Sequence, residues 1–233
     1  MNTLGSATGH RLAVLQNRFS TGRLLRLALL VALIVTPHAA HSQRARERIK
    51  SVGQAIARAS EAREAKRTTE RFDPIFKKYS KRYFGVGTDW HWFKAQGMAE
   101  SDLTPGATSR VGARGIMQLM PSTYGQIRTA LPHFGAIDNP EWNIAAGILH
   151  DRDLWTLWSR DVDEPERWHF VFAGYNAGEG TIMRARRAAF AAKLDDRTWP
   201  NIESVAPKVE RWRYTETLDY VRKIKANHAA LSP

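Results

Sequence analysis

The stretch from Ala99 to Pro121 reads AESDLTPGATSRVGARGIMQLMP, and it joins the end of one apolar helix to the start of another. Large apolar residues at helical spacing precede it, so Glu100 is expected at or near the C-terminal end of a helix. Pro105-Gly106 then forces a turn into a loop rich in glycine, serine and threonine. A short apolar segment, Ile116 to Met120, follows and stops at Pro121. The stretch therefore predicts a helix, a loop and a second helix in succession.

Helical periodicity also dominates the rest of the chain from Arg71 onward, and no convincing alternating strand is present. Thr88-Asp89 can cap the helix that leads to Glu100. The apolar stripes that predict helices and a buried core are Phe72 to Tyr79, Trp90 to Ala99, Trp142 to Leu149, Trp168 to Tyr175, Ile182 to Phe190 and Leu218 to Ile224. The fold class predicted from the sequence is mainly α, with one globular domain over residues 71–233.

The first 42 residues are typical of a signal peptide. An unbroken apolar run from Leu27 to Val35 follows four arginines and no acidic residue, and Ala40-His41-Ser42 supplies small residues for cleavage after Ser42. The run is shorter than the roughly 20 residues that a spanning helix needs. A buried core helix or an uncleaved membrane anchor are the alternatives. Since the chain has no cysteine, a lipid-modified N-terminus is excluded.

Residues 43–70 are charged and poor in large apolar side chains, so they are predicted to form a solvated helix or linker. Eight basic and four acidic residues lie in this range, and its only branched aliphatic residues are Ile49, Val52 and Ile56. Binding to a membrane surface or to nucleic acid is the alternative reading of such a charged segment.

The net charge limits the classes of binding partner, and the cysteine content limits how the fold can be stabilised. The 233-residue chain carries a formal charge of +12, and loss of the four arginines before Ser42 would lower it by four, to +8. Such a charge favours polyanionic partners, namely nucleic acid, anionic lipid or the carboxylate-bearing peptides of a cell wall. With no cysteine, no disulfide can form, so the core alone must stabilise the fold.

Glu100 is the strongest candidate for a catalytic acid. Apolar neighbours remove water from the charged carboxylate and favour its neutral form, and the negative end of a helix dipole acts in the same direction. Both conditions are expected at the end of this helix. Taken alone, an exposed glutamate with no special role is the commoner case.

Amide and aromatic side chains elsewhere suit a carbohydrate ligand. Gln118 and Asn176 each offer a carbonyl acceptor and an amide donor, which can read the hydroxyl and N-acetyl groups of a sugar. Tyr175 and Tyr220 can stack on a sugar ring or donate a hydrogen bond to the catalytic carboxyl.

Four segments in a fixed order carry a resemblance to a known family. They are Glu100-Ser101, Ser109 to Pro121, Tyr175-Asn176-Ala177-Gly178 and Glu216 to Val221. Together they resemble the catalytic domain of the soluble lytic transglycosylases, in the goose-type lysozyme-like superfamily. Thr88 to Ser101 is more similar to the membrane-bound F-type members. The resemblance covers roughly Phe72 to Ala226 and implies a helical, lysozyme-like catalytic domain within 71–233.

The resemblance also implies an activity. Glu100 would protonate the glycosidic oxygen between N-acetylmuramic acid and N-acetylglucosamine, and would then accept a proton from the muramic C6 hydroxyl to give a 1,6-anhydro product. The substrate's own N-acetyl group would replace a second carboxylate. Tyr175 would hold the carboxyl of Glu100, and Glu216 and Tyr220 would close the far wall of the groove. The implied substrate-binding residues are Ser109, Gln118, Met120, Tyr175, Asn176, Glu216 and Tyr220.

The signal-peptide pattern predicts export to the periplasm or cell envelope, with possible peripheral attachment there. We expect a monomer that acts on peptidoglycan strands with neither cofactor nor metal. The histidines show no HExxH spacing, which agrees with the lack of a metal site. Departures from the family pattern are mild at Gly174 and Ile116. A larger one is that residues 43–70 stand where the F-type members carry a solute-binding-like domain.

Three alternatives remain open. A hydrolytic muramidase would use water in place of the C6 hydroxyl, and a wall-binding or assembly protein would keep the fold without cutting. A nucleic-acid binder rests on charge alone, and a signal peptide argues against it.

Overall fold

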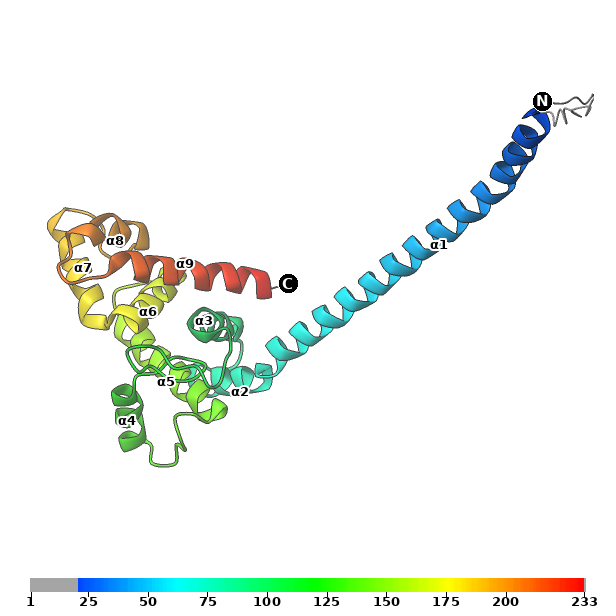
Figure 1. Cartoon of the computed structure of the whole chain (residues 1–233). Helices are drawn as coiled ribbons and strands as arrows, with labels where there is room; N and C mark the ends of the chain where they lie inside the picture. The colour runs from blue at the N-terminus through cyan, green and yellow to red at the C-terminus, as the bar shows by residue number, and fades with distance from the viewer. Residues whose placement is uncertain (1–20, 233) are drawn as a thin grey trace, which may run out of the picture. The chain divides into compact units, whose positions relative to one another are not determined.

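The computed structural model describes residues 21–232, with side chains from residue 41 onward except at 62, 65, 66 and 68 (Figure 1). Within that range the regular elements are helices, and the only β pairing consists of isolated bridges from Arg114 to Thr108 and to Leu119. The prediction of a mainly α fold is confirmed. The chain divides into two units, one ending at Glu64 and the other beginning at Ala65.

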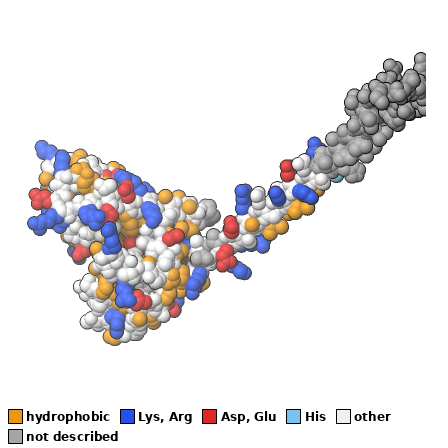
Figure 2. Space-filling view, viewed as in Figure 1, with side chains coloured by type: hydrophobic (Ala, Val, Ile, Leu, Met, Phe, Trp, Pro, Cys, Tyr) orange, Lys and Arg blue, Asp and Glu red, His pale blue; other side chains and the backbone are white. Residues whose placement is uncertain are grey.

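Helix α1, Thr21–Glu70, forms the described part of the first unit and continues into the second, and its described side chains up to Arg67 are exposed. Ile49, Val52 and Ile56 keep more than half of their surface in contact with solvent, as a solvated helix requires. Basic and apolar side chains alternate along this part of α1 (Figure 2). No helix in the described range is long and apolar enough to cross a bilayer. Of the predicted signal peptide, residues 1–20 and the side chains of residues 21–40 lie outside the described part of the structure.

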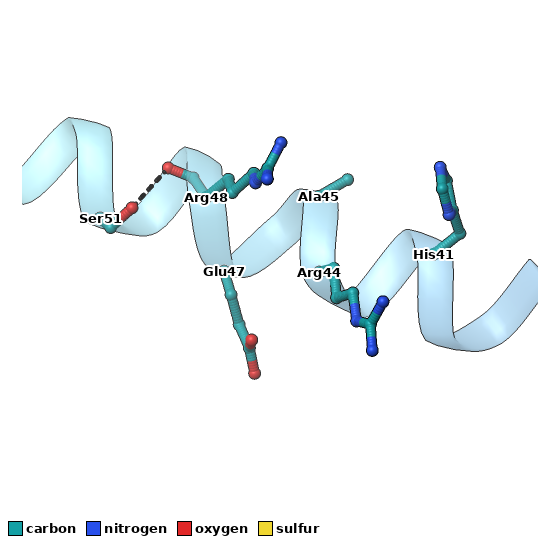
Figure 3. Close-up of a pocket in the computed structure, with 6 residues that line it drawn as sticks. All are labelled: His41, Arg44, Ala45, Glu47, Arg48 and Ser51. Atoms are coloured by element: carbon teal, nitrogen blue, oxygen red, sulfur yellow. Dashed lines mark hydrogen bonds between the residues drawn. The ribbon is translucent and has the colours of Figure 1, made fainter.

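A shallow hollow runs along α1, and Figure 3 shows its lining. One helix contributes every side chain there, and the one hydrogen bond among them joins Ser51 Oγ to the carbonyl oxygen of Arg48 at 2.9 Å. Ligand sites in proteins are concave and bury most of their ligand, which a single exposed helix cannot do. The hollow is therefore not a candidate functional site. It is lined by His41, Arg44, Ala45, Glu47, Arg48 and Ser51.

The second unit is a bundle of short helices. Helix α3 packs against α9, α5 packs against α2 and α6, and α6 also contacts α7 and α9. The elements are α2 Asp73–Phe84, α3 His91–Ser101, α4 Pro121–Ala130, α5 Pro140–Trp158, α6 Glu166–Ala177, α7 Glu179–Ala191, α8 Trp199–Val205, the 3-10 helix η1 Ala206–Lys208 and α9 Tyr214–Leu231. Prolines begin α4 and α5, where the missing N–H group costs no helical hydrogen bond.

The core of this unit is aromatic and continuous. Trp168 has ring contacts to Phe84, Trp92 and Trp155. Burial of large apolar side chains supplies most of the stabilisation of a domain without disulfides. Its largest fully buried side chains include Phe76, Phe93, Ile116, Met117, Trp158, Phe170, Phe172 and Ile182.

Candidate active site

Helix α3 ends where the sequence predicts. Asp89 Oδ1 accepts a hydrogen bond from the His91 N–H group at 3.0 Å, and Asp102 closes the other end in the left-handed conformation with φ 51°. Glu100 therefore lies in the last turn. A Cβ atom at Gly97 would lie 3.1–3.2 Å from side chains that include Ile116, so this glycine lets the apolar segment pack directly on α3.

The carboxyl of Glu100 is half-buried and has one protein donor. The Tyr220 hydroxyl donates a hydrogen bond of 2.6 Å to its Oε1 atom. Burial raises the pKa of Glu100 to about 7, and the Tyr220 hydrogen bond and the Lys223 charge act in the opposite direction. Lys223 Nζ donates to the Ala99 carbonyl oxygen at 2.8 Å, which holds the ammonium at the end of α3. The carboxyl is thus able to exchange a proton near neutral pH.

Three hydrogen bonds join the backbone of Ile116 and Met117 to side chains of α3, α5 and α6. Ser101 Oγ donates to the Ile116 carbonyl oxygen at 2.8 Å, and Tyr175 Oη donates to the Met117 carbonyl oxygen at 2.7 Å. The Met117 N–H group donates to Asn143 Oδ1 at 2.8 Å. The segments quoted around Glu100, Met117 and Tyr175 therefore meet in space.

Asn143 is a buried positioning residue that sequence reasoning missed. Its amide donates to the carbonyl oxygens of Arg114 and Ile137, at 3.0 and 3.1 Å. A Cβ atom at Gly115, where φ is +79°, would collide with the Asn143 amide nitrogen, so only glycine permits this approach. An asparagine within the apolar stripe of α5 was the available signal, since buried amides need partners.

The tyrosine in contact with the carboxyl of Glu100 is Tyr220 and not Tyr175. Tyr175 was expected to hold the carboxyl of Glu100, but its hydroxyl donates to Met117, and Tyr220 makes the contact with Glu100. The cause is the packing of α9 along α3, which also places Asn227 against the Ala95 carbonyl oxygen at 3.1 Å (Figure 1). Burial, and to a smaller extent the charge of Glu100, raises the pKa of Tyr175 and of Tyr220 well above the ordinary value.

The predicted sugar-reading amide of Gln118 is partly used within the protein. Gln118 has a positive φ of 43°, and its Nε2 donates to the carbonyl oxygens of Gly115 at 2.9 Å and Ala107 at 3.3 Å. Its donors therefore hold the turn. Ser109 is also engaged, because its Oγ accepts the Ala113 N–H group at 3.0 Å. Met120, 40% exposed, precedes α4 and presents an apolar surface.

Asn176, at the end of α6, lies near Glu216, at the start of α9. Asn176 Oδ1 accepts a hydrogen bond of 2.8 Å from Thr217 Oγ1, which accepts one of 3.0 Å from the indole of Trp212. Glu216 forms a 2.9 Å ion pair with Arg213. Both residues line one hollow, and Tyr220 follows Glu216 by one turn of α9. The structure thus brings Glu216 near Asn176 and Tyr220 to Glu100.

A sequence comparison identifies the family. The family model of the transglycosylase SLT domain matches residues 76–197, which is more than half of the chain. The chain belongs to this family.

Relatives of the SLT domain are longer proteins. The chain is 30% identical over 152 residues to the membrane-bound lytic murein transglycosylase F of Vibrio parahaemolyticus, an alignment that covers 64% of this chain and 27% of that protein. With the protein of the same name from Stutzerimonas stutzeri it shares 29% identity over 154 residues, covering 65% of this chain and 30% of the relative. The chain thus spans less than a third of the length of these relatives.

Two solved structures share the fold. The 70 kDa soluble lytic transglycosylase of Escherichia coli matches with a TM-score of 0.51 and 24% identity, over 68% of this chain and 23% of that one. The lytic transglycosylase Slt of Pseudomonas aeruginosa, solved as an inactive glutamate-to-glutamine mutant, matches with a TM-score of 0.55 and 20% identity, over 69% and 24% of the chains. The predicted lysozyme-like helical fold is confirmed.

The SLT domain contains a second buried acid that sequence reasoning missed. Gln96 Nε2 donates to Asp151 Oδ1 at 3.2 Å, and both side chains are fully buried. Gln96 Oε1 and Asp151 Oδ2 have no partner in the described structure. Burial, with a smaller effect of the Glu100 charge, raises the pKa of Asp151 well above the ordinary value. An acid among the apolar residues of α5 was the available signal.

No group of three or more histidine, aspartate or glutamate side chains suited to hold a metal ion occurs among the residues the structure describes.

Proposed function

We propose that this protein is a lytic transglycosylase that cleaves the β-1,4 bond between N-acetylmuramic acid and N-acetylglucosamine in peptidoglycan. The observation that supports it most is the half-buried carboxyl of Glu100, whose pKa is raised to about 7 by burial. Such a group is protonated often enough to act as an acid and ionised often enough to act as a base. The names of the relatives supply the substrate class.

In the proposed reaction Glu100 first protonates the glycosidic oxygen, and the bond from the muramic C1 to that oxygen breaks. Tyr220 is bound to one carboxyl oxygen, so the other remains for the substrate. The hydrogen bond from Tyr220 stabilises the carboxylate that this step creates. Glu100 then takes the proton of the muramic C6 hydroxyl as its oxygen bonds to C1, which forms the 1,6-anhydro ring and restores the acid.

The substrate's N-acetyl group is proposed to stabilise the cationic centre, so that no second carboxylate is needed. Asp151 does not suit the role of nucleophile, because it is fully buried. The proposed glycan groove is lined by Ser109, Gln118, Met120, Tyr175, Asn176, Glu216 and Tyr220. We infer that a monomer suffices and that neither cofactor nor metal takes part, since one chain supplies all of these groups.

We also propose that the protein is exported to the periplasm or cell envelope, with cleavage after Ser42. The apolar run and its preceding arginines support export. Peptidoglycan lies outside the cytoplasmic membrane, so an enzyme that acts on it must be exported.

The deciding experiment is mass spectrometry of purified murein digested by the wild type, by Glu100→Gln and by Glu210→Gln, a control at an exposed glutamate. We expect anhydro products from the wild type and the control, and none from Glu100→Gln. Products heavier by one water would identify a hydrolytic muramidase instead. If the wild type binds murein without cutting it, the wall-binding alternative is correct.

A further inference from the structure

Side chains on one side of α9 form four hydrogen bonds to α3 or to the residues that precede it, and we call these the α3–α9 bonds. Their partners follow one another in opposite directions along the chain, so the two helices run antiparallel. From the start of α9 to its end the pairs are Tyr220 with Glu100 at 2.6 Å, Lys223 with the Ala99 carbonyl oxygen at 2.8 Å, Asn227 with the Ala95 carbonyl oxygen at 3.1 Å and His228 with Asp89 at 2.7 Å.

His228 makes the bond that lies farthest from the candidate catalytic carboxyl. Its Nε2 atom bonds to Asp89 Oδ2, and its ring stacks on Trp92 of α3 with the ring centroids 3.5 Å apart. Burial acts to raise the pKa of Asp89, but hydrogen bonds from His228 and His91 outweigh it and hold that pKa below the ordinary value. Asp89 is therefore ionised at neutral pH and only accepts, so the imidazole of His228 is the donor.

The apolar contacts of α9 do not by themselves fix its position along α3. Leu218, Val221 and Ile224 are buried, but hydrophobic burial has no preferred direction. A hydrogen bond does have one, and it is lost when the donor moves by about 1 Å. A shift of α9 by one residue is about 1.5 Å and would break the α3–α9 bonds.

The position of α9 matters for Glu100, because both groups that lower the pKa of this carboxyl belong to α9. They are the Tyr220 hydroxyl and the Lys223 ammonium, and both oppose the larger effect of burial. The other ionisable neighbours of Glu100 are Asp151 of α5 and Tyr175 of α6, which take no part in the α3–α9 bonds. Displacement of α9 would therefore weaken the two groups that stabilise the carboxylate and leave burial in place.

We propose that Asn227 and His228 are positioning residues of the reaction, because they fix α9 along α3 and so hold the Tyr220 hydroxyl against the carboxyl of Glu100. The inference rests on the proposed function. Neither residue touches the reacting groups, since His228 lies eight residues, or about 12 Å along the helix, beyond Tyr220. Such distant residues can still control a rate, because a misplacement of about 1 Å at a catalytic group costs up to about 100-fold.

The test removes the two distant bonds and leaves Tyr220 unchanged. The double variant Asn227→Ala/His228→Phe lacks both bonds but keeps an aromatic ring for Trp92. We expect kcat on purified murein to fall by about tenfold. The alkaline limb of the pH profile should move up by about half a pH unit, because a weaker bond from Tyr220 destabilises the Glu100 carboxylate. Lys225→Gln, a control at an exposed residue of the same helix, should match the wild type.

Three further variants separate positioning from a general loss of stability. In a Tyr220→Phe background the hydroxyl is absent, so the double change should lower kcat by less than about twofold and leave the limb where Tyr220→Phe puts it. His228→Gln returns a donor to the place of the imidazole Nε2 and should keep the wild-type limb. Ile202→Val removes a buried methyl group from α8, so it should lower the stability and leave the limb in place.

The inference is overturned by an unchanged limb in the double variant, by an equal further loss with and without the Tyr220 hydroxyl, or by an equal movement in Ile202→Val. Circular dichroism checks that each variant is folded, and His228→Phe alone carries the same test if the double variant is not.

If the wild type does not cut murein, the proposed function fails, and carbon-13 NMR titration of the Glu100 carboxyl decides the inference separately. A titration midpoint that rises in the double variant, and not in Ile202→Val, supports positioning by Asn227 and His228. Equal midpoints in the wild type and the double variant contradict it.

Discussion

Two acids, Glu100 of α3 and Asp151 of α5, lie near the same face of α3 and differ in access to solvent. Glu100 is half-buried and bonds to Tyr220, whereas Asp151 is fully buried and bonds only to Gln96. Gln96 and Glu100 are four residues apart on α3, so they share a face of that helix. Burial raises the pKa of both acids.

The difference shows that a raised pKa alone does not make a catalytic acid. Asp151 is fully buried, where no substrate can reach it, and burial raises its pKa. In its protonated form it can donate a hydrogen bond to the otherwise unpartnered Gln96 Oε1. The Tyr220 hydroxyl and the Lys223 ammonium limit the rise in the pKa of Glu100. One oxygen of the Glu100 carboxyl stays available to a substrate. Four substitutions can break or sharpen this comparison.

The largest effect is expected from Glu100→Gln. The amide keeps the shape and can still accept the Tyr220 hydrogen bond, but it carries no exchangeable acidic proton. We predict a fall in kcat of about 10²- to 10⁴-fold, the usual contribution of general acid–base catalysis, with an unchanged circular dichroism spectrum. Activity within a few-fold of the Glu210→Gln control would remove Glu100 from the mechanism.

Tyr220→Phe tests the hydroxyl donor that Glu100 has, whereas the donor to Asp151 is the Gln96 amide. Removing the hydroxyl destabilises the Glu100 carboxylate, so the pKa of Glu100 rises and the alkaline limb of the activity profile moves up by about one pH unit. A drop in kcat of about tenfold should accompany it. Tyr175→Phe is the matched control. It should not move the alkaline limb of the activity profile, because the hydroxyl that it removes bonds to Met117 and not to Glu100.

Asp151→Asn should affect stability and leave the chemistry intact. The raised pKa means that the stability contributed by Asp151 is complete below the ordinary pKa of 3.8 and is lost as the pH rises above it. The asparagine amide can donate to Gln96 Oε1 at every pH, so we predict a gain of about 1 kcal/mol or more at pH 7 that shrinks toward pH 4.

Urea unfolding of Asp151→Asn and of the exposed control Asp163→Asn at pH 4, 6 and 8 measures that gain. The kcat of Asp151→Asn should stay within about twofold of wild type, since Asp151 is not placed in the chemistry. A loss as large as that of Glu100→Gln would show that the two acids act together.

Lys223→Met should give the smallest effect. The Lys223 charge lowers the pKa of Glu100 less than the Tyr220 hydrogen bond does, and the lysine side chain is exposed. We expect the alkaline limb to move up by roughly a few tenths of a pH unit, and less at high salt. A downward movement would contradict the sign of this interaction.

Much of the fold follows from local sequence signals. Helical spacing of apolar residues predicts the helices, and the turn at Pro105-Gly106 predicts that Glu100 ends α3. Pro121 likewise begins α4. These predictions succeed because each depends on residues a few positions apart.

The contacts between the residues of the site could not be predicted from local sequence signals. Tyr220 and Glu100 are 120 residues apart, and their contact depends on how α9 packs along α3. Gln118 turns its amide into its own loop because its backbone has a positive φ. Asp151 stands among the apolar residues of α5, but its partner Gln96 is 55 residues away on α3 and could not be identified from the sequence.

The most direct test of the account is the titration of the Glu100 carboxyl itself. Carbon-13 NMR of side-chain glutamate carboxyls, recorded for the wild type and for Glu100→Gln, isolates this group as the resonance that the variant lacks. The account predicts a titration midpoint near pH 7, because burial raises the pKa of Glu100 to about 7. A midpoint near the ordinary value of 4.5 would contradict it.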